Sequence, residues 1–286
     1  MLVVAGYAVV LVTVLVGFAS AGGHVGALIQ PAEFVVIGGA SLGALIVMSP
    51  KKVLVDLLHG LVQSIKGTPY NKAGYEDLFK VLYELLRLAR REGLLALEAH
   101  VSSPQESSIL NRSPRVAKNH HMMEFICGAL SPVIDGSLKP EQLASLLEGE
   151  LKLMEQEHHA PIDVLSKTAD ALPGFGIVAA VLGIVITMGA INGPIEEVGE
   201  HVAAALVGTF LGVLLSYGFA GPLAVKMEFL AAAEVAYFRA AAIVIQGLVS
   251  GLPPKVAVEQ ACRQVAAEVR PSRERLEELF TQAESS

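Results

Sequence analysis

Two histidine pairs are the first residues whose types could do chemistry, because imidazole is a common metal ligand. They lie in Asn119-His120-His121 and Glu157-His158-His159. Adjacent residues of a helix point about 100° apart. Neither pair therefore chelates on one face, as histidines at i and i+4 do. We interpret both pairs as solvated helix surface and predict no metal site and no cofactor.

Motifs for catalysis are absent from the remainder of the chain. There is no nucleophile elbow, phosphate loop or metalloprotease motif, so we do not expect an enzyme. Cys127 and Cys262 are interpreted as small buried hydrophobes and not as a disulfide. The net charge of −7 opposes nucleic-acid binding.

A different chemistry is possible where small residues and hydroxyls recur at helical spacing. The positions i, i+4, i+7 and i+11 are occupied by Gly176, Ala180, Gly183 and Thr187, and again by Ala205, Thr209, Gly212 and Ser216. One interpretation is close helix packing in lipid, which composition favours because such stripes are common in bundles. The other is a lumen lined by small groups, into which another helix fits.

Acidic residues are scarce in these apolar stretches, although ionisable groups usually mark ion pathways in membranes. None occurs within 2–19, 172–191 or 202–224, and Glu33 sits at the outer end of 31–48. If this protein moves ions, we expect the carboxylate that carries them to belong to another chain.

The distribution of Lys and Arg indicates which elements position these residues. All 21 fall within 51–170 and 221–286, and none occurs in 1–50 or 171–220. Lys and Arg are costly in hydrocarbon and collect on the cytoplasmic side. The predicted fold class is all-α, an integral membrane protein with four transmembrane helices and a helical cytoplasmic domain. The expected spans, each near the required length, are 2–19, 31–48, 172–191 and 202–224.

Lysines beside the span ends set the expected topology. Lys51, Lys52, Lys167 and Lys226 place the central segment, the tail and both termini in the cytoplasm. The predicted domains are two transmembrane helices, a cytoplasmic helical domain, two further transmembrane helices and a cytoplasmic helical tail, at 1–50, 51–170, 171–224 and 225–286.

The cytoplasmic segment carries an amphipathic helix pattern that ends near Gly93. Its apolar positions are Tyr75, Leu78, Phe79, Leu82, Leu85, Leu86 and Ala89. Further helices are expected at 114–132 and 139–165, with a connection at 102–113. After the fourth span we expect the helix to continue through Ile245, then a short helix near 258–265 and a last polar helix.

Two prolines stand at the cytoplasmic ends of the third and fourth spans. Pro173 could start one helix and Pro222 could end another, since proline is tolerated at those places. Alternatively, they are paired kinks where membrane events reach the cytoplasmic domain. The residues alone leave both interpretations open.

Several motifs resemble the MotA family of flagellar motor stator proteins. Residues 170–181 read DALPGFGIVAAV and resemble its third-span signature, while 207–212, VGTFLG, with Tyr217-Gly218-Phe219 and Pro222 behind it, resemble its fourth. Gln30-Pro31-Ala32-Glu33 resembles the start of its second span. The likeness covers essentially the whole chain, although the ExbB and TolQ relatives share the pattern of the third and fourth spans.

The resemblance implies a stator subunit in the bacterial inner membrane that converts proton flow into torque. Family members form a ring, thought to be a pentamer, around a dimer of MotB. That single-span, peptidoglycan-anchored partner supplies the ion-binding Asp, which fits the missing carboxylate. The ring's cytoplasmic domain pushes on the rotor protein FliG through charges.

The resemblance also assigns roles to single residues. The family's rotor-facing residues correspond to Arg90 and Glu98. Without the family, both would be interpreted as solvated helix surface. The family's coupling residues, which link ion flow to movement of the ring, correspond to Asp170, Pro173 and Pro222.

The expected lining of the ion path is Ala180, Thr187 and Thr209. The resemblance implies that the Thr209 hydroxyl faces the partner's carboxylate. Ala180 stands where sodium-driven relatives carry a hydroxyl, which favours protons as the coupling ion.

Two other functions fit parts of the pattern. One is an ExbB/TolQ-type energiser of an outer-membrane system, a group that usually has three spans and another N-terminal orientation. The other is a non-conducting membrane scaffold, in which the small-residue stripes serve packing only.

Overall fold

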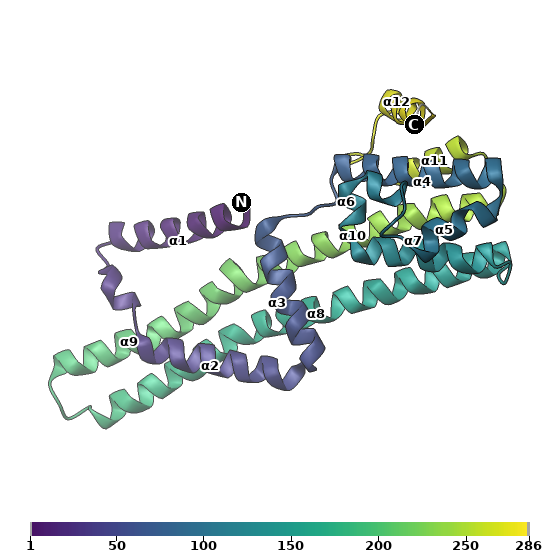
Figure 1. The fold of residues 1–286 in the computed structure, drawn as a ribbon. Helices are drawn as coiled ribbons and strands as arrows, with labels where there is room; N and C mark the ends of the chain where they lie inside the picture. Colours follow the sequence, from purple (N-terminus) through teal and green to yellow (C-terminus); the bar gives the residue numbers. More distant parts are fainter. Residues whose placement is uncertain (1, 285–286) are drawn as a thin grey trace. The chain divides into compact units, whose positions relative to one another are not determined.

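The computed structural model describes residues 2–284, and within them every regular element is helical (Figure 1). This confirms the all-α prediction. The described helices of four or more residues are α1 (Leu2–Ser20), η1 (Val25–Leu28), α2 (Pro31–Met48), α3 (Lys51–Lys66), α4 (Lys72–Glu92), η2 (Leu94–Leu97), α5 (Glu98–Ser102), α6 (Pro114–Ala117), α7 (His120–Ile134), α8 (Pro140–Gly189), α9 (Ile195–Leu214), η4 (Leu215–Ala220), α10 (Gly221–Val249), α11 (Pro254–Arg263) and α12 (Arg273–Glu284). A short turn, η3, covers Leu110–Arg112.

Four described helical stretches are long and apolar enough to cross a membrane, as predicted. The first is α1, and the second, Val25–Met48, combines η1 and α2. The bounds of α1 and α2 lie within a residue of the expected spans 2–19 and 31–48. The third lies in α8 and the fourth in the continuous stretch Ile195–Val249. Their apolar side chains are largely exposed within the single chain, which suits contact with lipid or with other chains.

The chain divides into two compact units. The first combines the stretch up to Gly67 with Glu157–Leu230, and the second combines Thr68–Gln156 with the stretch from Ala231 onward. Helices α8 and α10 each contribute to both units. The predicted domains follow membrane topology and not compactness, so this division does not test their boundaries. They stay a prediction.

The prediction of a separate helix at 139–165 is wrong, because α8 continues through it into the third span. Both Pro161 and Pro173 lie inside this helix. Proline removes one backbone hydrogen bond, but packing against neighbouring helices holds the remaining turns in place. Pro173 is therefore not the first residue of a helix.

Pro222 does not end its helix either. It is the second residue of α10, directly after the π-helical segment η4, where Gly221 N–H donates to the carbonyl of Ser216 five residues back. A proline ring clashes with the carbonyl four residues before it. The wider π turn changes the pairing just ahead of Pro222, so the chain remains helical from α9 to α10.

Two local elements also differ from the expectation. The helix expected at 114–132 is split into α6 and α7, because the Asn119 side chain caps α7 by accepting from Met122 N–H at 3.1 Å. Helix α3 follows Pro50 and was not predicted. In the first unit, Lys52 of α3 pairs with Glu157 of α8 at 2.5 Å.

Helix α4 is the centre of the second unit, and all seven of its predicted apolar positions are buried. It begins at the capping side chain of Asn71 and ends at Gly93, whose φ of 91° suits glycine. Aromatic rings of α10 complete the core, with Tyr237 against Tyr75 at 5.1 Å and Phe238 against Phe125 at 5.3 Å. The predicted helices after residue 250 are present as α11 and α12.

Candidate functional site

The two small-residue stripes meet in a seam between α8 and α9, both in the first unit. A Cβ built on Gly176 would lie 2.8 Å from the Gly208 carbonyl oxygen and 3.0 Å from Gly212 Cα. A Cβ on Gly183 would lie 2.8 Å from the Ala205 Cβ. No side chain separates the two backbones at Gly176, and only the methyl group of Ala205 does so at Gly183. Here the stripes serve close helix packing, as composition favoured.

The predicted path residues lie on the same stripes but differ in environment. Ala180 and Thr209 are half-buried in the single chain. Thr187 is buried, and its hydroxyl donates to the Gly183 carbonyl of its own helix at 2.8 Å. That hydroxyl oxygen keeps acceptor capacity toward another group. Lining of an ion path by these three residues stays a prediction.

Glu33 of α2 is a candidate functional residue to which the sequence analysis assigned no role, since it was placed at the outer end of its span. Its side chain is buried, at 7% exposure, against the α8–α9 seam. Its Oε2 would lie 2.5 Å from a Cβ on Gly208. The available signal was an acid at the start of an otherwise apolar run.

The three predicted coupling residues lie in the first unit. Asp170 is exposed on α8, one turn before the half-buried Pro173. The carbonyl of Leu172 approaches the seam, where a Cβ on Gly212 would lie 2.7 Å away. Pro222 is exposed in the first turn of α10. The structure thus places Asp170 and Pro173 beside the seam along α8, and coupling through them stays a prediction.

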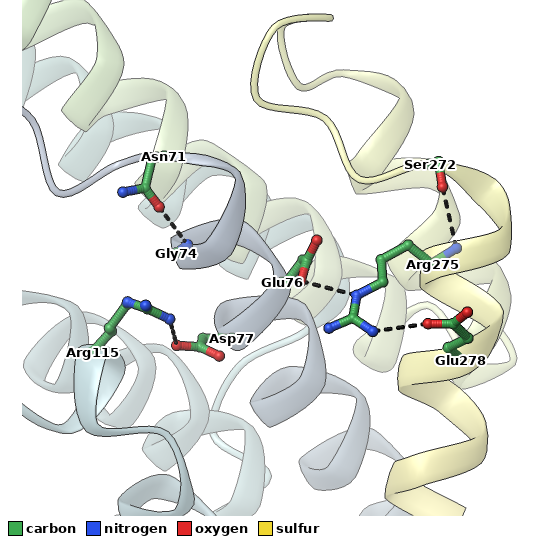
Figure 2. Close-up of polar contacts among 8 residues, drawn as sticks. All are labelled: Asn71, Gly74, Glu76, Asp77, Arg115, Ser272, Arg275 and Glu278. Carbon is green, nitrogen blue, oxygen red and sulfur yellow. Dashed lines mark hydrogen bonds and ion pairs between the residues drawn. The ribbon is translucent and has the colours of Figure 1, made fainter.

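Most charges of α4 are committed to contacts within the second unit. Figure 2 shows Glu76 accepting from Arg275 of α12 at 3.1 Å and Asp77 accepting from Arg115 of α6 at 2.9 Å. The Arg87 guanidinium donates to the Ala283 carbonyl at 2.6 Å. These ion pairs and hydrogen bonds fasten α6 and α12 to α4.

Glu84 makes the most buried of these contacts, with 6% of its side chain exposed. Arg112 donates to its Oε2 at 3.0 Å, while no group among the described residues hydrogen-bonds its Oε1. Burial raises the pKa of Glu84, and the nearby Arg112 only partly opposes that rise.

Arg90 and Glu98, the predicted rotor contacts, differ from these paired charges. Both are exposed, Arg90 near the end of α4 and Glu98 at the start of α5. Arg90 makes one long hydrogen bond, to the Gly251 carbonyl at 3.5 Å. Neither takes part in an ion pair within residues 2–284 that would neutralise it. The two charges are available to another molecule.

Four apolar spans, a tight glycine seam between two of them and a charged helical unit define a class, that of multi-span helical membrane proteins with an additional helical unit. Two family descriptions match, "Motility protein A N-terminal" over residues 4–93 and "MotA/TolQ/ExbB proton channel family" over residues 115–240. The chain belongs to the MotA family.

Individual relatives agree with this membership. The chain is 37% identical to motility protein A of Salmonella typhimurium, over 97% of this chain and 94% of the relative. It is 36% identical to the chemotaxis protein LafT of Vibrio parahaemolyticus, over 98% of both chains.

Solved structures share the fold. The flagellar MotAB stator complex of Bacillus subtilis matches with a TM-score of 0.73 and 25% identity, over 96% of this chain and 97% of that one. The MotAB structure of C. jejuni matches with a TM-score of 0.77 and 20% identity, over 95% and 98%. The chain is a flagellar stator subunit of the inner membrane.

Proposed function

We propose that this stator subunit forms a pentameric ring around a dimer of a MotB-type partner, and that the assembly conducts protons. The observation that carries the proposal is the α8–α9 seam, which holds two spans at backbone contact beside the half-buried Thr209. The span portions of α8 and α9 supply no carboxylate within 172–191 or 202–214. The ion-binding Asp is then the partner's, and Thr209 faces it while Ala180 and Thr187 line the remaining path.

The partner is proposed on the relatives named as MotAB complexes. Much of the apolar surface of the four spans is open in the single chain, including Ile177, Val181 and Val213. Neighbouring copies in a ring and a partner helix would cover part of that surface. Protons are proposed as the coupling ion because Ala180 adds no hydroxyl ligand for sodium.

Torque is proposed to pass from Arg90 and Glu98 to charges on FliG. The support is their exposure and their lack of ion pairs with any residue from 2 to 284, in contrast to Glu76, Asp77 and Glu84. Exposed interfacial charges fix register and orientation more than they add affinity. Asp170, Pro173 and Pro222 are proposed to transmit the effect of proton uptake from the membrane spans to the soluble part.

Orientation follows the flanking lysines. Both termini and the segment between α2 and the third span would lie in the cytoplasm, and 20–30 and 192–201 outside. Reporter fusions at residues 25, 195 and 284 test this topology. The four spans and the match to the MotA N-terminal family favour the stator over an ExbB/TolQ-type energiser.

The decisive experiment co-expresses the chain with a MotB-type partner and reconstitutes the purified complex in liposomes. A proton gradient should dissipate faster than in liposomes that hold either protein alone, and a sodium gradient should not. An assembled complex without proton flux would instead indicate a non-conducting scaffold.

A further inference from the structure

Glu33 stands apart from the other acids of the chain because it is buried in the membrane-spanning part without a partner. Its Oε2 has no hydrogen bond to any described residue. The surrounding side chains are apolar, with Ile37 of α2, Ala179 of α8 and Val207 of α9 in one buried cluster. An isolated ionised carboxylate in such surroundings is costly unless it binds a proton or a cation.

The approach of Glu33 to α9 depends on a missing side chain. Gly208 leaves the space that the carboxyl occupies, because a Cβ there would lie 2.5 Å from Glu33 Oε2 and 3.1 Å from Ala179 Cβ. The carboxyl therefore reaches the α9 backbone directly beside Thr209, the residue expected to face the partner's acid.

Two further titratable groups lie on the face of α9 that carries Gly208. Glu197, His201 and Gly208 are spaced four and seven residues apart, which places them on one helix face. His201 Nδ1 is buried and, among residues 2–284, has no hydrogen-bond partner. Glu197 is exposed in the first turn of α9. His201 and Gly208 are about 10 Å apart along the axis, so a proton relay between them requires a chain of several waters.

The other elements near Glu33 add few competing charges. The part of α8 that packs in this cluster, residues 171–189, contains no titratable side chain. Helix η1, which follows the exposed His24, contains none either. The remaining acids of α9, Glu196 and Glu200, are exposed near its start. Glu196 and Glu200 point about 120° and 80° away from Gly208 around the helix. The groups of α9 that could exchange protons with Glu33 are therefore His201 and Glu197.

We propose that Glu33 is a proton-binding station on the stator subunit itself, fed from the start of α9 through His201 and delivering to the partner's acid near Thr209. The inference rests on the proposed function. In each step the Glu33 carboxylate takes one proton from a hydronium ion or from the His201 imidazolium, which leaves water or the neutral imidazole, and becomes a neutral acid. It then gives that proton to the partner's carboxylate, and no electrons are transferred.

The test uses the full-length chain with its MotB-type partner in liposomes, with proton flux as the readout. Glu33→Gln keeps the shape and hydrogen-bonding capacity of the side chain but cannot carry the proton, so flux should fall about tenfold or more. Glu33→Asp should retain part of it. Glu196→Gln is the matched control, since it removes an exposed acid from the same region, and it should conduct like the wild type.

The outcomes separate this inference from the proposed function. If the wild type conducts protons and Glu33→Gln conducts them equally well, the proton-binding role of Glu33 is contradicted while the proposed proton conduction still holds. An assembled wild-type complex without flux would overturn the channel. If Glu33→Gln fails to assemble, the His201→Gln variant tests the relay instead, because the half-buried His201 tolerates substitution more readily than the buried Glu33. Reduced flux in that variant supports the relay, and unchanged flux contradicts it.

Discussion

Gly176 of α8 and Gly212 of α9 lie backbone against backbone, so that a Cβ on Gly212 would be 2.8 Å from Gly176 Cα. Adjacent spans approach this closely only where both lack side chains. The contact fixes the separation of the two helices that carry Ala180, Thr187 and Thr209. Small changes at this contact should therefore alter both the packing of the spans and the proposed ion path.

Gly176→Ala should destabilise the α8–α9 pair. Its added methyl group would meet the Gly208 carbonyl oxygen at 2.8 Å, and backbone cannot give way as a flexible side chain does. We expect a cost of about 1–3 kcal/mol, the usual range for overpacking. Amide hydrogen exchange in the membrane part of α8 and α9, measured on the purified complex, checks this.

Gly174→Ala is the control for that change, because Gly174 is on the same helix but has open space around its missing Cβ. Its exchange rates should match the wild type or slow slightly, since Ala favours helix over Gly. Equal behaviour of the two variants would contradict the packing role of the seam.

Arg90→Glu should reduce torque while the complex still assembles. The exposed guanidinium makes no ion pair among the described residues, so its replacement leaves no buried partner unpaired. Reversal of a charge at an interface creates repulsion, and we expect torque at high load to fall about two- to tenfold. Tethered-cell rotation under increasing viscosity provides the measurement.

Arg273→Glu is a suitable comparison for Arg90→Glu. Arg273 is also in the second unit and highly exposed, at 86% of its side chain, and makes only a 3.5 Å pair with Glu277 of its own helix. Torque in this variant should stay near the wild type. A similar loss in both variants would indicate a general effect of charge on assembly.

Pro173→Ala should uncouple proton flow from rotation without loss of the helix. The substitution restores a backbone donor inside the continuous α8 and removes a ring that crowds the preceding turn, so helix stability should rise. If the irregularity at Pro173 transmits movement, torque should fall while flux in liposomes persists. Pro161→Ala changes the same helix away from the seam and should affect torque much less.

The pH dependence of the second unit should reflect Glu84. Because burial raises the pKa of Glu84 in the folded state above its ordinary 4.5, the folded chain holds a proton that the unfolded chain releases. The contribution of this group to stability is thus full below pH 4.5 and is lost as pH rises through the folded pKa. Glu84→Gln should flatten this slope, seen as a weaker pH dependence of hydrogen exchange in α4.

Arg112→Ala tests the same contact from the other side. It would leave the Glu84 carboxylate buried without the guanidinium that pairs with it, and the cost should approach about 2–3 kcal/mol, reduced by the partial exposure of Arg112. The double variant with Glu84→Gln should recover much of this loss. Full additivity of the two changes would contradict a direct coupling.

Local pattern in the sequence was enough for several elements. Helix α4 follows from its apolar spacing and from Gly93 at its end, and α1 and α2 follow from apolar runs of sufficient length. These features depend on residues within a few turns of one another, so periodicity and capping determine them. The family motifs in 170–181 and 207–212 likewise needed no structure to indicate a stator subunit.

Other features depend on contacts between distant segments, and the tertiary structure decided them. Proline chemistry alone could not show that α8 passes through Pro173 or that η4 precedes Pro222, because packing determines whether a helix survives a lost hydrogen bond. Nor could spacing show which of the α4 charges find partners. Glu33 and Gly208 are 175 residues apart, and only the packing of α2 on α9 brings this acid to a position where a missing side chain leaves room for it.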